Sequence, residues 1–487
     1  VKALATDDSD AMEMTFPVYE HGTLKTEAWS LALRSDQPQG SITFNVPEER
    51  KPETTRLEVR YSPTLALAMI DALPYLADYP YGCTEQTLNR FVPTVITLGV
   101  LKDLGVDLKQ VRDKRVNLNA QEIGKAKDRA QRWQGKDRDG GPKEAVFDEE
   151  KVLKMARAGV NRLEAMRNAD GGWGWFPGGR ESSVHITAQV VHGLILAKAS
   201  GMKLDNDLIT SGTQWLSQYA DRELARLQLP EKHRDRKAYP DDTDALVHAV
   251  LVEAGAGNAA MRAALYEHRA KLSHLNLALL GLACAKVEEN ERRDMCLRNL
   301  RQFVKQDDEN QTAWLDLPAN GWWYWWHDPI ETQAAFLKLL CTVEPKGDLA
   351  ARIAKHLLNN RRNGTYWNST RDTAAVIDAL AVFVKASGES KPDVKLEVVI
   401  DGVVKKQVSI NADNLFSFDS ALVLEGEALS AGKHTLELRK QGGSPLYANA
   451  YLTLFSKEDM IPAAGLEVKV QRTFYKLTEQ KTKDRKS

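Results

Sequence analysis

The chain has 487 residues, of which 43% are hydrophobic and 27% are charged. These are ordinary values for a globular protein, and at roughly 100–200 residues per domain the length predicts about three domains. Lys and Arg number 66 and Asp and Glu number 67, so the net charge is −1, which argues against nucleic-acid binding and against attraction to anionic membranes.

The chain begins with Val1, and no signal peptide follows, so we expect a mature product or an excised fragment. No apolar run reaches the roughly 18 residues that a membrane-spanning helix needs.

Residues 1–60 are rich in strand formers and turns. Residues 41–46 and 55–61 alternate apolar with polar side chains, which is the period of half-buried strands.

From about residue 64 to residue 386 the chain has the helical period, with apolar side chains at i, i+3 and i+4. The clearest helical segments are residues 64–76, 186–199, 245–254, 275–285 and 374–384. A charged stretch at 125–151 is predicted to be a solvated loop or a charged helix face.

Weak repeats run through this helical block. Aromatic turns at residues 170–176, 320–325 and 363–367 each precede an apolar helix. Gly permits the tight turn, the aromatic side chains cover helix ends, and Asp or Thr is expected to cap the next helix. Helical hairpins repeated around a circle predict an α/α toroid, with an open superhelical stack as the alternative.

After about residue 392 the period returns to two, with strands predicted at 394–400, 403–410, 433–440, 448–455 and 466–470. Asp401-Gly402 is a hairpin signal. Neither β flank is long enough for a sandwich alone, so we predict a mainly α chain with flanking β, in which an α/α toroid is inserted into one split β-sandwich domain. The predicted parts are residues 1–60 and 389–457 for the β-sandwich, 61–388 for the helical domain and 458–487 for the truncated start of another domain.

The segment Tyr79-Pro-Tyr-Gly-Cys83-Thr-Glu-Gln86 carries the strongest chemical signal. Cys83 and Gln86 stand at i and i+3, so their side chains are neighbours on a first helical turn. A thiol beside a carboxamide can attack its carbon, expel ammonia and leave an internal thioester, with Glu85 relaying the proton. Water would destroy this bond, so an apolar cover is expected, to which Tyr79 and Tyr81 are placed to contribute. The alternative is a free cysteine beside an unrelated glutamine.

Cys284, Cys296 and Cys341 lie in apolar or mixed helical segments and are predicted to be buried as small hydrophobic side chains. They lack a CxxC partner or a nearby His, so neither a metal site nor a disulfide framework is predicted. No cofactor is expected beyond the internal cross-link between Cys83 and Gln86.

Residues 79–93, Tyr-Pro-Tyr-Gly-Cys-Thr-Glu-Gln-Thr-Leu-Asn-Arg-Phe-Val-Pro, resemble the thioester segment of bacterial alpha-2-macroglobulins. Residues 62–75, the aromatic repeats, the split β flanks and residues 463–475 are also similar to that family, so the resemblance covers nearly the whole chain. It implies a toroidal thioester domain (TED) of the kind shared with complement proteins, followed by the start of a receptor-binding-like domain.

The resemblance further implies a broad-spectrum protease trap of the bacterial periplasm rather than an enzyme. In such a trap a protease cuts a bait region, the molecule rearranges, and the exposed thioester acylates a Lys amine or a hydroxyl of the protease through Gln86. Full-length relatives are lipid-anchored to the inner membrane, often associated with a penicillin-binding protein, and monomeric, and we expect the same here. No bait region is recognisable in the chain. The family also places an aromatic latch over the thioester, for which Tyr447 is the candidate, with packing in the β domain as the alternative.

Several alternatives stay open. His233 and His185 are candidates for the acyl-transfer His that complement thioester proteins carry, but a charged loop and a capping role explain them equally simply. An α/α-toroid enzyme of terpene-cyclase type could use the acidic residues at 241–244 as proton donors, for which helix capping is the alternative. A cysteine hydrolase with Cys83 as nucleophile and a non-covalent envelope scaffold are the remaining alternatives.

Overall fold

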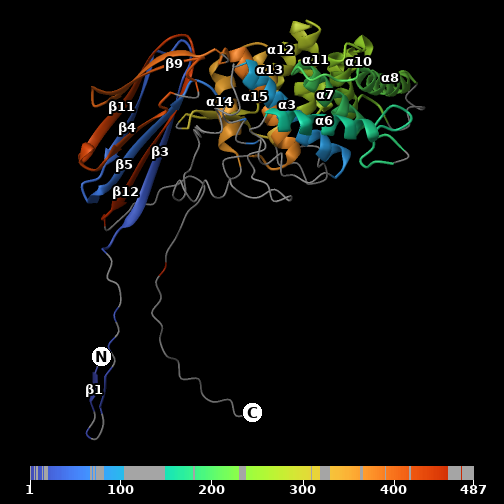
Figure 1. Ribbon diagram of the computed structural model, residues 1–487. Helices are drawn as coiled ribbons and strands as arrows, with labels where there is room; N and C mark the ends of the chain where they lie inside the picture. Colours follow the sequence, from blue (N-terminus) through green and yellow to red (C-terminus); the bar gives the residue numbers. More distant parts are fainter. Residues whose placement is uncertain are drawn as a thin grey trace.

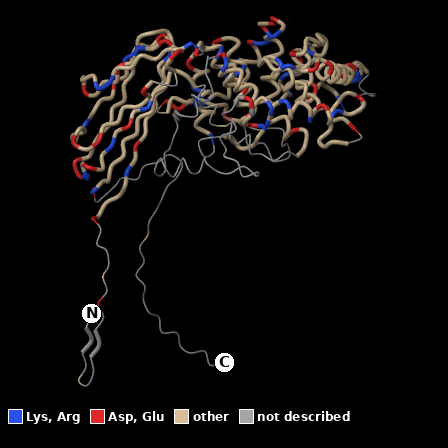
Figure 2. Tube along the Cα trace, in the orientation of Figure 1, with Lys and Arg blue, Asp and Glu red and all other residues tan. Residues whose placement is uncertain are grey.

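A β-rich part and a helical part lie side by side in the computed structural model (Figure 1). The structure describes residues 20–65, 82–103, 149–178, 181–229, 237–308, 310–317, 329–361, 366–389, 391–415 and 418–458, together with residues 2–4, 9–11 and a few single positions. Lys and Arg are interspersed with Asp and Glu along the described chain (Figure 2). This mixing agrees with the net charge of −1. Within the described residues, no helix is both long and apolar enough to cross a membrane.

Two four-stranded antiparallel sheets form the β part, and both flanks of the chain contribute to each sheet. The first has the order β10-β5-β12-β3, with β10 at Ala421–Glu425, β5 at Arg50–Ser62, β12 at Leu446–Ser456 and β3 at Thr23–Leu33. The second has the order β4-β11-β8-β9, with β4 at Gln39–Val46, β11 at Gly432–Gln441, β8 at Asp393–Ile400 and β9 at Val403–Asn411.

The two sheets pack on one another through apolar side chains, because alternate residues of each strand point inward. The rings of Trp29 from β3 and Phe44 from β4 lie 5.7 Å apart between their centroids. Since β5 precedes the helical block and β8 follows it, the block is inserted between strands of one β-sandwich, and the predicted architecture is confirmed. Strands β3 and β10 were not among the predicted ones.

The hairpin between β8 and β9 turns at Asp401 and Gly402, which have φ of 51° and 78°. Two consecutive residues with positive φ are what a tight type I′ hairpin turn requires. The hairpin predicted from the Asp-Gly pair is therefore confirmed.

Six of the described helices form a closed inner ring. They are α3 (Thr84–Asp103), α7 (Val184–Ala199), α9 (Asp242–Glu253), α11 (His274–Lys286), α13 (Pro329–Cys341) and α15 (Thr370–Ser387). Each packs on the next, and α15 packs back on α3. The helices between them in sequence pack outside the ring: α6 (Glu149–Ala165), α8 (Asn206–Gln228), α10 (Ala259–Glu267), α12 (Asn290–Arg301) and α14 (Asp348–Asn359).

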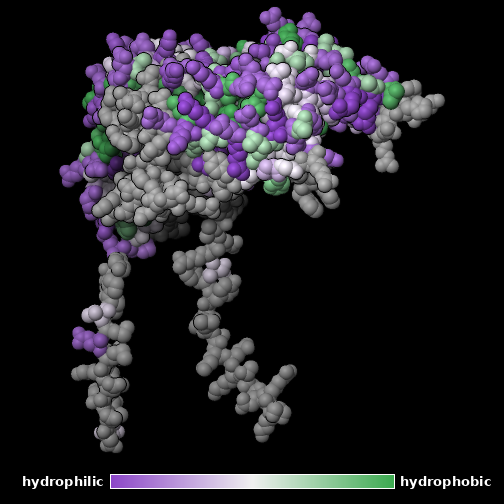
Figure 3. Space-filling view, turned by 45° about the vertical axis from the view of Figure 1, so that its right-hand side comes forward, coloured by the Kyte–Doolittle hydropathy of each residue, from purple (hydrophilic) through white to green (hydrophobic). Residues whose placement is uncertain are grey.

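This arrangement is an α/α toroid, as predicted. Inner and outer helices alternate along the described chain. The N-terminal ends of neighbouring inner helices contact each other, since Arg371 of α15 pairs with Glu331 of α13 and the Ser273 N–H, just before α11, donates to Asp242 of α9. The inner helices therefore share one direction, and their N-terminal ends gather at one end of the ring. Figure 3 shows hydrophilic residues over most of the described surface on one face, with smaller hydrophobic areas over the helical part.

Two aromatic repeats have the same internal structure. The indole Nε1–H of Trp173 donates to the Leu163 carbonyl at the end of α6, over 2.7 Å, and that of Trp367 donates to the Leu357 carbonyl near the end of α14, also over 2.7 Å. Both indoles are fully buried. Each tryptophan thus satisfies a carbonyl that a helix end leaves without an intrahelical partner, which explains the aromatic repeat.

The caps that follow these tryptophans differ from the prediction. Ser183 caps α7 and Ser369 caps α15, rather than Asp or Thr. Serine accepts from the free amides of a first helical turn as well as Asp does. The third aromatic turn, at 320–325, lies outside the described residues, as do most of the helix predicted at 64–76, the charged stretch up to 148 and the strand predicted at 466–470.

Candidate functional site: the first turn of helix α3

Cys83 and Gln86 lie against each other at the start of α3. Cys83 directly precedes the helix, is 8% exposed and is a free cysteine. The Gln86 backbone N–H donates to Cys83 Sγ over 3.5 Å, and the Cys83 backbone N–H donates to Gln86 Oε1 over 3.2 Å. This reciprocal pair has the pattern of a capping box, in which the residue before the helix and the third helical residue satisfy each other's amides. Sulfur here replaces the usual hydroxyl oxygen.

The turn that contains Trp175 anchors this first helical turn. The Thr84 backbone N–H donates to the Trp175 carbonyl over 2.9 Å, and the Thr84 hydroxyl donates to the Gly174 carbonyl over 2.6 Å. From α6, Arg162 Nη2 donates to the Gly82 carbonyl over 3.2 Å. The peptide around Cys83 is therefore held from two segments that follow it by about 80–90 residues.

Glu85 lies one residue before Gln86 and is half-buried. Burial raises the pKa of its carboxyl above the ordinary value, and the positive charge of Arg371 works against that rise. Asn89 Nδ2 donates to Glu85 Oε1 over 3.3 Å. A carboxyl with a raised pKa holds its proton closer to neutral pH, which suits a group expected to give a proton to departing ammonia.

His185 lies at the start of α7, where the positive charge of Arg371 also acts on it. Burial, with a further contribution from Arg371, lowers the pKa of His185 to about 4. Its imidazole is therefore neutral at pH 7. Arg371 itself forms an ion pair with Glu331 at the start of α13, over 3.0 Å. His233, the other candidate histidine, lies outside the described residues.

Sequence reasoning did not find Arg371 or Arg162. The repeat does contain a signal for Arg371. Glu85, His185 and Arg371 each stand two residues after the residue that precedes their helix, namely Cys83, Ser183 and Ser369. Helices α15, α3 and α7 are neighbours in the ring, so equivalent positions of the repeat converge at one end of the toroid.

Comparison with known proteins agrees with this architecture. Residues 62–223 match a family model described as the A-macroglobulin TED domain. An alpha-2-macroglobulin of Thermotoga maritima is 22% identical over 378 residues, which are 78% of this chain and 18% of the relative. An alpha-2-macroglobulin homologue of a Nostoc species is 24% identical over 306 residues, which are 62% of this chain and 15% of that relative.

The predicted resemblance to the bacterial alpha-2-macroglobulins is confirmed. The chain spans less than a fifth of the length of these two alpha-2-macroglobulin relatives. Among solved structures, Escherichia coli alpha-2-macroglobulin activated by porcine elastase shares the fold with a TM-score of 0.53 and 19% identity, over 91% of this chain and 33% of that one.

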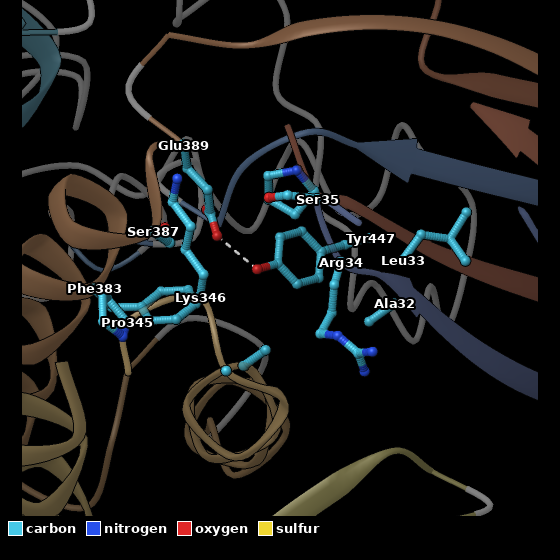
Figure 4. Close-up of a pocket in the computed structure, with 13 residues that line it drawn as sticks. Ala32, Leu33, Arg34, Ser35, Pro345, Lys346, Phe383, Ser387, Glu389 and Tyr447 are labelled. Atoms are coloured by element: carbon cyan, nitrogen blue, oxygen red, sulfur yellow. Dashed lines mark hydrogen bonds between the residues drawn. The ribbon is translucent and has the colours of Figure 1, made fainter. Parts of the chain in front are cut away.

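The residues expected to shield an alpha-2-macroglobulin thioester are only partly described. Tyr79 and Tyr81 lie outside the described residues. Tyr447 is buried in β12, where its hydroxyl donates to Glu389 Oε1 over 2.6 Å (Figure 4). The described residues that line the pocket around Tyr447 include neither Cys83 nor Gln86. These contacts favour the packing alternative for Tyr447 over a latch on the candidate thioester.

The remaining cysteines are structural. Cys284, Cys296 and Cys341 are buried and free. Burial raises the pKa of Cys284 to about 11 and those of Cys296 and Cys341 to about 12, so these thiols stay protonated and inert. The part of the chain that the structure describes holds no group of His, Cys, Asp and Glu suited to a metal ion.

The acidic residues at 241–244 serve the fold. Asp241 caps α9, and Asp244 completes a capping box with it. Lys237 pairs with Asp244 over 2.8 Å and with Asp241 over 3.1 Å. The helix-capping alternative is therefore confirmed for Asp241 and Asp244. The carboxylate oxygens of Asp241 and Asp244 are thus already engaged by backbone amides at the start of α9 and by the Lys237 ammonium group, which weakens the terpene-cyclase alternative.

Proposed function

We propose that this chain is the part of a broad-spectrum protease trap that carries an internal thioester between Cys83 Sγ and Gln86 Cδ. The observation that supports it is the reciprocal pair of hydrogen bonds in the first turn of α3, in which each of the two side chains accepts from the other residue's backbone amide, within a segment that matches the A-macroglobulin TED domain. The trap is a single-use reagent rather than an enzyme, since each thioester is consumed by one acyl transfer.

The chemistry proceeds in two acyl transfers. In the first, the Cys83 sulfur attacks the Gln86 carboxamide, the C–N bond breaks, and ammonia leaves with the thiol proton, relayed by Glu85. In the second, a Lys amine of the target attacks the Gln86 carbonyl, the C–S bond breaks, and Cys83 regains a proton. The neutral imidazole of His185 is a candidate to accept the proton of an incoming amine or hydroxyl, or to take the acyl group itself.

Proteases are the proposed targets, because the solved Escherichia coli neighbour is one activated by porcine elastase. For the full-length protein we propose the periplasm, a lipid anchor, a penicillin-binding protein as a partner and a monomeric state, all from the family resemblance.

Intact-mass analysis of freshly purified protein tests the thioester. We expect a mass lower by one ammonia than the sequence gives. Methylamine should then add once, on Gln86, and free one thiol. The Cys83→Ala variant should show neither change. If fresh wild-type protein has the mass calculated from the sequence and forms no methylamine adduct, the result would contradict the thioester and favour the non-covalent scaffold.

Protease capture is tested separately. Incubation of the full-length protein, which supplies the bait region, with elastase should give an adduct that survives denaturing electrophoresis, and methylamine pre-treatment or Cys83→Ala should abolish that adduct. An adduct that persists in Cys83→Ala would show that capture does not use the thioester.

A further inference from the structure

A backbone amide is already aimed at the oxygen on which charge would develop at the candidate site. The Cys83 N–H donates to Gln86 Oε1 over 3.2 Å. When any nucleophile adds to Gln86 Cδ, the carbonyl electrons move onto this oxygen. Donors fixed in advance at such an oxygen are the main way in which acyl-transfer sites stabilise a tetrahedral intermediate.

We propose that the Cys83 backbone N–H is the oxyanion donor for both the formation and the use of the thioester, and that Gly82 is a positioning residue that gives Gln86 Oε1 the space to reach this donor. The inference rests on the proposed function, because it requires acyl transfer at Gln86. It assigns to the capping hydrogen bond of α3 a second role in the chemistry.

The need for glycine at position 82 is spatial. A Cβ on Gly82 would overlap Gln86 Oε1 and lie 3.2 Å from Gln86 Cδ. Gly82 is not among the described glycines with positive φ, so an alanine suits its backbone and the strain falls on the Gln86 carboxamide. That carboxamide would have to swing away from the Cys83 N–H, beyond hydrogen-bond distance.

The Gly82 peptide is itself held in place. Arg162 Nη2 donates to its carbonyl over 3.2 Å, and the next residues are fixed by the Thr84 hydrogen bonds to Gly174 and Trp175. A donor that is fixed in this way needs little reorganisation when charge appears on Oε1, and this is the condition under which it lowers a barrier.

Both steps balance with this donor in place. During formation, Cys83 Sγ adds to Cδ, the negative charge on Oε1 is held by the N–H, and the intermediate collapses as ammonia departs with the thiol proton. During use, an amine adds to Cδ, the same N–H holds the charge, and the intermediate collapses as the Cys83 thiolate leaves and takes up the amine proton. No oxidant, reductant or metal is required.

The test compares wild type, Gly82→Ala and the control Gly443→Ala. Gly443 has nothing within 4 Å of an added Cβ and no positive φ. For each protein, intact mass gives the fraction that carries a thioester, and thiol release under methylamine gives the rate constant of aminolysis. We expect Gly82→Ala to carry less thioester and to react on the order of 10²-fold more slowly, while the control matches wild type and all three melt at similar temperatures.

The two readouts separate the outcomes. A lower thioester fraction with an unchanged rate constant would mean that Gly82 acts on folding alone and would overturn the inference, as would a fraction and a rate equal to wild type. Wild-type protein without ammonia loss would overturn the proposed function and this inference together. If Gly82→Ala does not fold, Arg162→Gln decides: we expect slower aminolysis because the Gly82 peptide loses its anchor, and a wild-type rate constant would overturn the inference.

Discussion

Replacing Glu389 by glutamine should stabilise the protein at high pH and leave it unchanged at low pH. Glu389 is fully buried where the chain leaves α15 for the β-sandwich. Its Oε1 accepts from the Tyr447 hydroxyl and its Oε2 accepts from the Leu65 backbone N–H, over 2.6 and 2.8 Å. The residue thus joins both connections of the inserted helical block to strand β12. Burial, only partly offset by these hydrogen bonds, raises the pKa of the Glu389 carboxyl to about 7.

Whether the stability rises or falls with pH depends on which state, folded or unfolded, binds the Glu389 proton more tightly. A carboxyl whose pKa rises on folding is most favourable below its unfolded pKa of 4.5, and this contribution is lost as the pH rises through about 7. At 1.36 kcal/mol per pKa unit, the full loss is about 3 kcal/mol. Glutamine keeps both contacts without charge, because its oxygen can accept from Leu65 and its NH₂ can donate to the Tyr447 hydroxyl. We therefore expect Glu389→Gln to gain about 1–3 kcal/mol at pH 8 and almost nothing at pH 5.

Urea unfolding followed by circular dichroism at pH 5 and pH 8 measures the effect. Because Glu389 joins the two parts of the molecule, the shift should appear in the first unfolding transition. The exposed Glu427, replaced in the same way, serves as the matched control and should leave the pH dependence of wild type intact. Parallel pH profiles for wild type and Glu389→Gln would refute the reasoning, since they would show that Glu389 carries no penalty when ionised.

Three further predictions concern the repeat and the site. Trp173→Phe should lower the free energy of unfolding by about 1–3 kcal/mol, because the buried Leu163 carbonyl loses its donor; thermal unfolding measures this, and an unchanged stability would contradict the role of the Trp173 indole at the end of α6. Cys83→Ser should be about 1 kcal/mol more stable than Cys83→Ala, because the hydroxyl can still cap α3, although neither variant should lose ammonia; equal stability would mean that the capping box contributes nothing. Glu85→Gln should slow ammonia loss after refolding by about 10²-fold, timed by intact mass, and an unchanged rate would remove Glu85 from the proton relay.

Local sequence signals predicted most of the fold. Strict alternation identified β4, β8 and β11, whose burial alternates along the strand, and two residues with positive φ follow directly from Asp401-Gly402. Strand β3 was not predicted from the sequence, because its N-terminal half is mostly exposed and only its last residues are buried. Its register depends on β12, more than 400 residues later, and no local pattern shows such a partner.

The candidate site likewise combines residues that the sequence predicts with residues that only the tertiary structure brings to it. Cys83, Glu85 and Gln86 are neighbours in the sequence, so the spacing alone places their side chains on one helical turn. Arg371 and Arg162 reach the site only because the ring closes and α6 packs on α3, so their roles depend on tertiary structure. The Tyr447 latch was inferred from the family, whereas its hydroxyl is engaged by Glu389.

The ring geometry turns a sequence repeat into a spatial cluster. Because the inner helices share one direction, the second residue of α15, α3 and α7 falls at the same end of the toroid, and these residues are Arg371, Glu85 and His185. One guanidinium then acts on an acid and on a base at once: it moderates the rise in the pKa of Glu85 and helps to keep His185 neutral. The first turn of α3 can form the reactive pair by itself, but the protonation states around that pair are set by its neighbours in the ring. The insertion of a closed toroid, rather than an open stack of helices, therefore has a chemical consequence, since only closure brings α15 back beside α3.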